Sequence, residues 1–358
     1  MKVYIKYIIK NFVKLLFIIS SIFFILVLLL NLLQELDFFK NTNESLYYPL
    51  LLNILNAPSI LINIFPFIFL ISAQFLFINL IDKNELIILK NFGIDNLRLI
   101  SIISLISFIA SLFIIIFFYN FSAKLKHFYL EIKNNFASDN KYLAVITENG
   151  IWIKDQVNEN INIINANNFQ NNYLYEVDIL QFDKDFNLLK NIISSKILIS
   201  EKTWQLNNAI IYDAEGKVEE VNNYILDTNL NFNDLNSLYS NLSSLNIFEL
   251  NNLKKKYESI NYSSTEIDSA IQKLISFPFY LMIMTVLASA LMINIKHNKS
   301  KIFYLIFGIL ISVIIYYLSF FFEELGKNEQ IPIGISIWIP LIIIMLISSI
   351  SLIRINEK

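Results

Sequence analysis

The chain has 358 residues, of which 55% are hydrophobic and only 16% are charged, and its formal net charge is −2. A soluble chain of this length is about a quarter charged, so this composition is typical of an integral membrane protein. The nearly balanced charge argues against nucleic-acid binding, and the absence of cysteine excludes disulfides and cysteine-ligated metal sites.

The first third of the chain contains three apolar runs long enough to cross a bilayer core of about 30 Å, which takes roughly 20 helical residues. They cover residues 12–33, 48–81 and 99–119. No small-residue cleavage site follows the first run, so we interpret it as a retained span and not as a signal peptide. The second run is too long for one straight span and contains Pro58 and Pro66. We expect a short lead-in followed by a span that enters near Leu61.

The middle of the chain, residues 122–269, is polar and contains no apolar run of 20 residues. Apolar and polar residues alternate clearly in 173–179, and Asp183 to Asn187 is typical of a turn. Further strands are expected at 143–147, 150–154, 161–164, 195–199, 203–206 and 209–213. Short strands at this spacing favour a sandwich or a jelly-roll. A helix is expected over 247–258.

Three more apolar runs follow, at 270–293, 302–322 and 331–353. The sequence therefore predicts an α-helical integral membrane protein with six transmembrane helices. An extracytoplasmic all-β, jelly-roll-like domain is inserted between helices 3 and 4. The expected parts are residues 1–121 with a cytoplasmic loop at 82–98, the inserted domain at 122–269, and residues 270–358.

Lysine and arginine in short loops predict the orientation, because cytoplasmic loops are richer in these residues. They gather near the start, between runs two and three, before run five and in the tail: Lys2, Lys6, Lys10, Lys14, Lys83, Lys90, Arg98, Lys296, Lys299, Lys301, Arg354 and Lys358. The loops after runs one and five are net acidic. We expect both chain ends to be cytoplasmic and the insertion to be extracytoplasmic.

Several kinds of chemistry have no motif in this sequence. There is no P-loop, and His127 and His297 are expected on opposite sides of the membrane, so no nucleotide site, metal site or catalytic triad is predicted. Ionisable residues are almost absent from the spans, which disfavours a proton- or ion-coupled carrier. Asn31, Asn53, Asn63 and Gln74 are more typical of hydrogen bonds between helices than of substrate ligands. We expect a non-catalytic protein without a cofactor.

Two tryptophans of the insertion, Trp152 and Trp204, lie among alternating apolar residues. Ordinary core packing is the first interpretation of both. The alternative is that inward-facing aromatic side chains line a groove for an acyl chain.

The loop at 82–98 carries a short amphipathic helix. Leu86, Leu89 and Phe92 recur at helical spacing, Asp82 and Asn84 can cap its start, and Gly93 can end it. An acid early and apolar residues later suit a docking element for a cytoplasmic partner. A helix that lies on the inner leaflet fits the pattern equally well.

The whole chain resembles the LptF/LptG family of lipopolysaccharide-export permeases. The resemblance rests on three-plus-three spans around a β domain, and on the loop segment with Glu85, Leu86 and Gly93, which is similar to the family's coupling helix. The segments at 149–155, 245–262 and 331–340 look most like LptG.

The resemblance implies an ATP-driven exporter in the bacterial inner membrane. This chain would pair with an LptF-like permease and with an LptB-like ATPase dimer, through Glu85, Leu86, Leu89 and Gly93. Its β domain would pass lipopolysaccharide to an LptC-like bitopic protein and a periplasmic bridge. The lipid would contact the first and fifth spans and the β domain, at Leu26, Leu30, Asn31, Phe307, Ile311 and Trp152.

One departure from the family concerns the outer part of the first span. Some relatives have a basic residue there that meets lipid phosphate, whereas this chain has Asn31 and Gln34, and Lys40 is the first cation beyond them.

Three alternatives stay open at this point. The chain resembles the LptF-type partner as well as LptG. A membrane-anchored scaffold or sensor with a ligand-binding β domain needs no docking helix at 82–98. A membrane-embedded enzyme is disfavoured by the lack of acid, base or nucleophile constellations.

Overall fold

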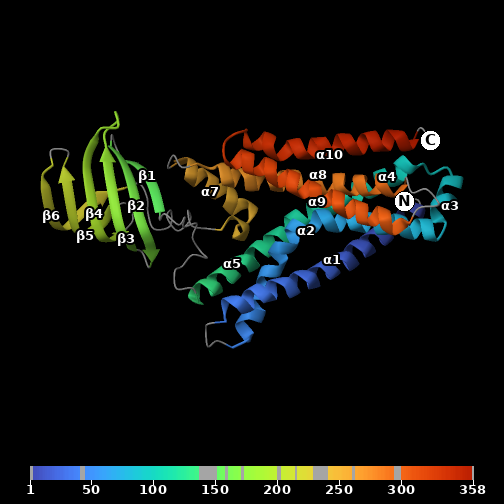
Figure 1. Ribbon diagram of the computed structural model, residues 1–358, viewed down its shortest axis with the longest axis horizontal. Helices are drawn as coiled ribbons and strands as arrows, with labels where there is room; N and C mark the ends of the chain where they lie inside the picture. Colours follow the sequence, from blue (N-terminus) through green and yellow to red (C-terminus); the bar gives the residue numbers. More distant parts are fainter. Residues whose placement is uncertain are drawn as a thin grey trace. The chain divides into compact units, whose positions relative to one another are not determined.

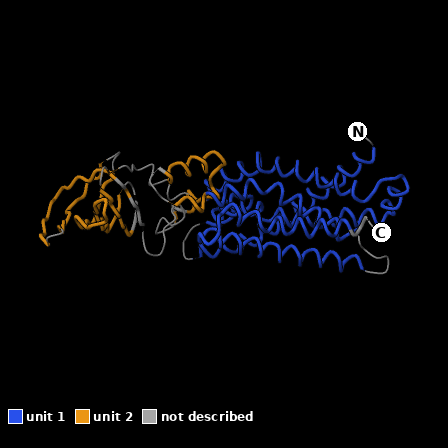
Figure 2. Tube along the Cα trace, turned by 90° about the horizontal axis from the view of Figure 1, so that it is seen from above, with its two compact units in different colours: residues 1–129, 268–358 blue, residues 130–267 orange. Residues whose placement is uncertain are grey.

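A computed structural model describes residues 3–40, 45–136, 151–157, 160–170, 173–199, 203–213, 216–228, 241–259, 263–293 and 300–356. The chain forms two compact units (Figure 2). Residues 1–129 and 268–358 make up the first, which we call the helical unit, and residues 130–267 make up the second, which we call the β unit.

Six helices in the described part of the chain are long and apolar enough to cross a membrane, as predicted. The first two are α1 (Val3–Phe38) and α2 (Tyr47–Asp82). The expected break in the second run is wrong, because α2 is one continuous helix with Pro58 and Pro66 inside it. Both prolines are buried among neighbouring helices, where membrane helices tolerate proline because the freed backbone groups find other partners.

The third span is also longer than its apolar run. It consists of α4 (Asn96–Phe113), a π-helical segment η1 (Ile114–Tyr119) and α5 (Asn120–Phe136). Helical structure thus continues past residue 121, and the boundary between the compact units falls after Tyr129. The remaining spans are α8 (Thr265–Ile293), α9 (Lys301–Lys327) and α10 (Ile333–Asn356).

The spans differ greatly in how far the rest of the protein covers them. In their most apolar stretches, 61% of residues are buried in α2 and 56% in α8, but only 11% in α1 and 17% in α9. The centre is closely packed: the rings of Phe12 and Phe69 meet edge to face at 6.4 Å. Thr285 of α8 donates a hydrogen bond to Ser107 of α4 at 2.9 Å. Since lipid tails are as apolar as leucine, such close packing and hydrogen bonding hold membrane helices together.

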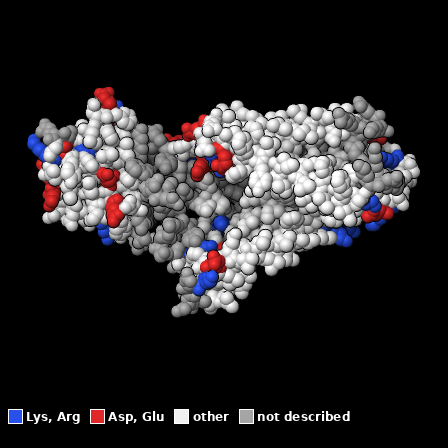
Figure 3. Space-filling view, in the orientation of Figure 1, with Lys and Arg blue, Asp and Glu red and all other residues white. Residues whose placement is uncertain are grey.

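The two ends of the helical unit differ in what they carry. The start of α1, the end of α10 and the short helix α3 (Glu85–Asn91) lie at one end (Figures 1 and 2). On the face seen in Figure 3, lysine, arginine, aspartate and glutamate gather toward the ends of the helical unit and leave its middle uncharged. An uncharged belt between charged ends is the surface expected of a protein that crosses a bilayer.

The described strands of the β unit form one antiparallel sheet, in which each strand pairs with the next along the chain. The strands are β1 (Ile151–Val157), β2 (Asn160–Gln170), β3 (Tyr173–Phe182), β4 (Leu188–Ile199), β5 (Thr203–Asp213) and β6 (Val218–Asp227). This is a meander of a single sheet, so the jelly-roll prediction is not confirmed by the described residues.

Alternation along the strands builds the core of the sheet. Ile164, Ile179, Ile192 and Ile211 lie on neighbouring strands in register and are buried together. Trp204 is also completely buried in this cluster, as ordinary core packing requires.

Several sequence predictions for this unit are confirmed. The expected turn exists: the carboxylate of Asp183 accepts bonds from the backbone N–H groups of Asp185 and Asn187, at 2.9 and 2.8 Å. The expected helix also forms, as α7 (Ile247–Ser259), and Asn246 and Glu249 cap its start reciprocally. The segments 203–206 and 209–213 belong to the single strand β5. The expected strand at 143–147 lies outside the described residues.

Candidate functional site

The short helix α3 follows α2 directly, and its start does not have the expected caps. Asn84 occupies the N-cap position in the left-handed conformation, with φ of 57°, and its side chain makes no capping bond. Asp82 instead forms an ion pair with Lys301, the first residue of α9. The expected capping by Asp82 and Asn84 is therefore wrong, because a partner 219 residues away engages Asp82.

The end of α3 is closed by a Schellman motif, as its glycine suggests. The N–H of Gly93 donates to the carbonyl of Lys90 at 2.9 Å, and the N–H of Ile94 donates to that of Leu89 at 3.1 Å. Gly93 has φ of +75°, a conformation that glycine adopts without the steric cost of a Cβ. Ile94 is buried, which fixes the chain as it leaves the helix.

The apolar residues of α3 point in two directions. Leu86 and Leu89 pack against the core of the helical unit, so they seat the helix. Ile87 and Ile88 are each 50% exposed, and Phe92 is 81% exposed. We call Ile87, Ile88 and Phe92 the outer face of α3. The sequence placed Leu86, Leu89 and Phe92 on one face, but the structure separates Phe92 from the two leucines.

Glu85 lies in the first turn of α3 and already has a partner within the chain. The hydroxyl of Tyr7, on α1, lies 2.8 and 2.9 Å from the two carboxylate oxygens of Glu85. A carboxylate offers about four acceptor positions, so Glu85 can bind a further cation while it accepts from Tyr7. The site at α3 thus combines a carboxylate with an exposed apolar face.

The residues expected to contact lipid differ in how far they are exposed. Leu26, Leu30 and Phe307 are exposed on α1 and α9, at 46%, 66% and 43%. Ile311 is partly covered by the core, and Asn31 is buried. Trp152 lies in β1, but its side chain is outside the described part of the structure.

Asn31 is held in a network of amides between α1 and α2. Its Nδ2 donates to Oδ1 of Asn53 at 2.9 Å, and its Oδ1 accepts from Asn56 at 3.0 Å. Gln74 likewise donates to the carbonyl of Tyr304 on α9, at 3.1 Å. The prediction of interhelical hydrogen bonds is therefore confirmed for Asn31, Asn53 and Gln74, while Asn63 is exposed.

Charged groups extend this network to α5. Lys126 donates to Oδ1 of Asn56 at 2.6 Å, and its Nζ lies 4.3 Å from the centre of the Tyr129 ring. The Tyr129 hydroxyl donates to the carboxylate of Glu35, which is only 1% exposed, at 2.9 Å. The sequence alone predicts that Glu35 lies in an acidic loop. Its partner is 94 residues away, and no local pattern indicates such a contact.

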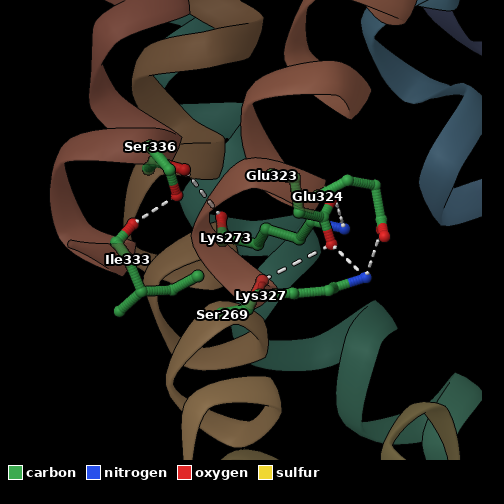
Figure 4. Close-up of polar contacts among 8 residues, drawn as sticks. Ser269, Lys273, Glu323, Glu324, Lys327, Ile333 and Ser336 are labelled. Atoms are coloured by element: carbon green, nitrogen blue, oxygen red, sulfur yellow. Dashed lines mark hydrogen bonds and ion pairs between the residues drawn. The ribbon is translucent and has the colours of Figure 1, made fainter. Parts of the chain in front are cut away.

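A second buried carboxylate lies between α8 and α9 (Figure 4). Glu323 is 6% exposed and binds Lys273 at 2.5 Å and Lys327 at 2.9 Å. Ser269 donates a longer bond to the same carboxylate at 3.4 Å. Both lysines remain partly exposed, with 52% and 32% of their side-chain surface accessible. This cluster joins the two helices at the end of the unit opposite α3.

Comparison with known proteins decides the family. Residues 6–354 match the family described as lipopolysaccharide export system permease LptF/LptG. The chain belongs to the LptF/LptG family. No curated protein matches the sequence. Membership in LptF/LptG and six apolar helices identify a multi-pass protein of the inner membrane, from a family of lipopolysaccharide export permeases.

Proposed function

We propose that the chain is the LptG-like permease subunit of an ATP-driven exporter that extracts lipopolysaccharide from the inner membrane. The observation that carries the proposal is the LptF/LptG match over residues 6–354, which includes both compact units. In this proposal the permease is non-catalytic and has no cofactor, and a separate ATPase supplies the energy.

The proposed ATPase contact is α3. Its outer face of Ile87, Ile88 and Phe92 is exposed beside the carboxylate of Glu85, at the end of the helical unit that carries both chain ends. An LptB-like ATPase dimer would cover the apolar residues and present a cation to Glu85. The seating residues Leu86 and Leu89 would hold the helix for that contact, and Gly93 would end it.

The proposed lipid route follows the two least covered spans, α1 and α9. An LptF-like permease would face them and enclose lipopolysaccharide against exposed residues such as Leu26, Leu30 and Phe307. The β unit would then pass the lipid to an LptC-like bitopic protein and a periplasmic bridge. This route requires cytoplasmic chain ends and a periplasmic β unit. The choice of LptG over LptF rests on the segments at 149–155, 245–262 and 331–340.

Copurification with the ATPase tests the proposal. The wild-type chain, together with its partner permease, is expected to retain the ATPase. Phe92→Asp and Glu85→Lys are expected to lose most of it, because they place like or uncompensated charge in the contact. Phe186→Asp is the matched control, since Phe186 is 59% exposed in a turn of the β unit. If the wild type retains no ATPase, the exporter proposal fails; if Glu85→Lys binds as well as wild type, Glu85 is not in the contact.

Labelling of single cysteines tests the orientation, and the native chain has no cysteine to remove. In intact spheroplasts, a membrane-impermeant maleimide is expected to label Asp185→Cys in the β3–β4 turn. Asn91→Cys on α3 is expected to react only after permeabilisation. The opposite pattern would contradict the proposed topology.

Photocrosslinking tests the lipid route. A photoreactive residue at Leu30 or at Phe307 is expected to capture lipopolysaccharide. Leu105 on α4 serves as the control, because it is exposed to a similar degree, at 60%, on a different span. Equal capture at all three positions would indicate bulk membrane contact and overturn the proposed route.

A further inference from the structure

Two polar contacts connect the region of α3 to helices other than its own neighbour in sequence. The first joins Tyr7 of α1 to Glu85 of α3, with distances of 2.8 and 2.9 Å. The second joins Lys301, at the start of α9, to Asp82, the last residue of α2 before α3 begins. The ends of α1 and α9 that we propose to be cytoplasmic therefore both contact the region of α3, the proposed docking helix.

Helix electrostatics do not account for where the second pair lies. Asp82 is at the C-terminal end of α2, where the helix dipole disfavours a negative charge. Lys301 is at the N-terminal end of α9, where the dipole disfavours a positive charge. The charge of each residue is unfavourable at that end of its own helix, and the opposite charge of the other residue compensates for it. The contact between α2 and α9 therefore explains why both charges are there.

The contacts are also weak enough to open. The Asp82 and Lys301 side chains are 49% and 37% exposed, and exposed ion pairs contribute only about 0–1 kcal/mol to stability. Tyr7 is 39% exposed. Contacts of this kind add little to the fold but can guide the motion of the elements they join.

The two helices reached by these contacts are the least covered spans. Only 11% of the most apolar stretch of α1 and 17% of that of α9 are buried, against 61% in α2. The most apolar stretches of α1 and α9 are therefore the least covered by the rest of the protein, so a lipid or a second permease would touch them. Tyr7 connects α1 directly to α3, and Lys301 connects α9 to the last residue of α2, immediately before α3.

We infer that Tyr7 and Lys301 are positioning residues that transmit movement of the docking helix to α1 and α9. This inference rests on the proposed function, because it requires an ATPase that moves α3. It adds two residues of the transmission path, one on each moving span, and their partners Glu85 and Asp82.

Charge reversal tests the ion pair in reconstituted proteoliposomes with the ATPase and partner permease. The readout is lipopolysaccharide released per ATP hydrolysed. Asp82→Lys and Lys301→Asp are each expected to lower this ratio about two- to fivefold, the range that a weak ion pair allows. The double variant is expected to recover most of the loss, because a reversed pair restores the attraction. Lys255→Asp, at an exposed position of α7 in the β unit and with the same change of charge as Lys301→Asp, is the control and is expected to behave as wild type.

Removal of one hydroxyl tests the second contact. Tyr7→Phe is expected to lower the ratio of lipid released to ATP hydrolysed, with unchanged ATPase copurification and unchanged thermal unfolding. Tyr4→Phe, one turn earlier on the same helix, is the matched control.

The outcomes separate the two proposals. A wild-type complex that does not assemble, or assembles without releasing lipid, overturns the proposed function and this inference with it. A wild-type complex that works, with single variants that match it or a double reversal that adds their losses, overturns the inference alone. Loss of ATPase binding in the single variants would also overturn it, since the pair would then act in docking and not in transmission.

Discussion

The two ends of the helical unit are stabilised by polar contacts of different kinds. At the end that carries α3, the contacts of Tyr7 with Glu85 and of Lys301 with Asp82 are substantially exposed. At the opposite end, Glu35 and Glu323 are 1% and 6% exposed. Glu35 accepts a hydrogen bond from Tyr129 of α5, and Glu323 binds Lys273 of α8 and Lys327 of its own helix. Buried charges that lose a partner cost far more than exposed ones. We therefore expect the end with Glu35 and Glu323 to stay fixed, while the end with α3 can rearrange.

The largest expected effect of a single change is at Glu323. Glu323→Leu leaves Lys273 and Lys327 without their shared carboxylate, and we expect a loss of about 2 kcal/mol of stability, because both lysines can still reach water. Glu324→Ala is the control, since the Glu324 side chain is 40% exposed and its carboxylate binds Lys327 at 3.0 Å, and we expect less than about 1 kcal/mol. Thermal unfolding in detergent measures both. Equal effects would remove the distinction between the two kinds of contact.

The next comparison is between buried Asn31 and its exposed neighbour Leu30. Asn31→Leu breaks its bonds with Asn53 and Asn56 inside the membrane region, and we expect a loss of about 1 kcal/mol. Leu30→Ala removes an exposed side chain and is expected to leave the unfolding temperature unchanged. If the Leu30 variant were the less stable one, the network would not hold α1 to α2.

Gly93 tests the local geometry of the docking helix. Gly93→Ala forces a Cβ into a left-handed residue, and we expect a cost of about 1 kcal/mol, confined to α3 and visible as faster hydrogen exchange there. Gly334→Ala is the matched control. Both positions have open space for a Cβ, but Gly334 has ordinary helical backbone in α10 and should tolerate alanine.

The smallest effect is expected at the exposed turn of the β unit. Hydrogen bonds from Asn187, first from its side chain and then from its backbone, lower the pKa of Asp183 below the ordinary 3.8. The ionised carboxylate thus stabilises the turn above the ordinary pKa, and this contribution is lost as the pH falls through the lowered value. Hydrogen exchange at Asn187 should rise in Asp183→Ala at neutral pH. A difference from wild type that persists after Asp183 is fully protonated would contradict this explanation.

The sequence predicted most of what depends on local pattern. Apolar runs located the six spans found among the described residues, and Gly93 marked the end of α3 correctly. The pattern of α3 did not reveal that Leu86 and Leu89 face the protein's own core while Ile87 and Ile88 face outward, because a short helix with apolar residues on both sides has no unique inner face. The edge strand β6 was missed because it is mostly exposed and its residues do not alternate.

Long-range pairs account for the rest of what sequence reasoning missed. From the sequence, Asp82 was expected to cap α3, and Lys301 was one of the cations that predict the cytoplasmic side. Glu35 was expected in an acidic loop. Each is explained by a partner distant in sequence: Asp82 and Lys301 by each other, and Glu35 by Tyr129. Charge and spacing along one segment carry no information about such partners, so the contacts of the candidate site required the fold.

The most direct test of the account is ATP-dependent lipid release from proteoliposomes that contain this chain, an LptF-like permease and the ATPase. We expect the wild-type complex to pass lipopolysaccharide to a periplasmic acceptor only when ATP is hydrolysed, and Phe92→Asp to abolish the release because the ATPase no longer docks. A fully assembled wild-type complex that hydrolyses ATP without releasing lipopolysaccharide would contradict the account.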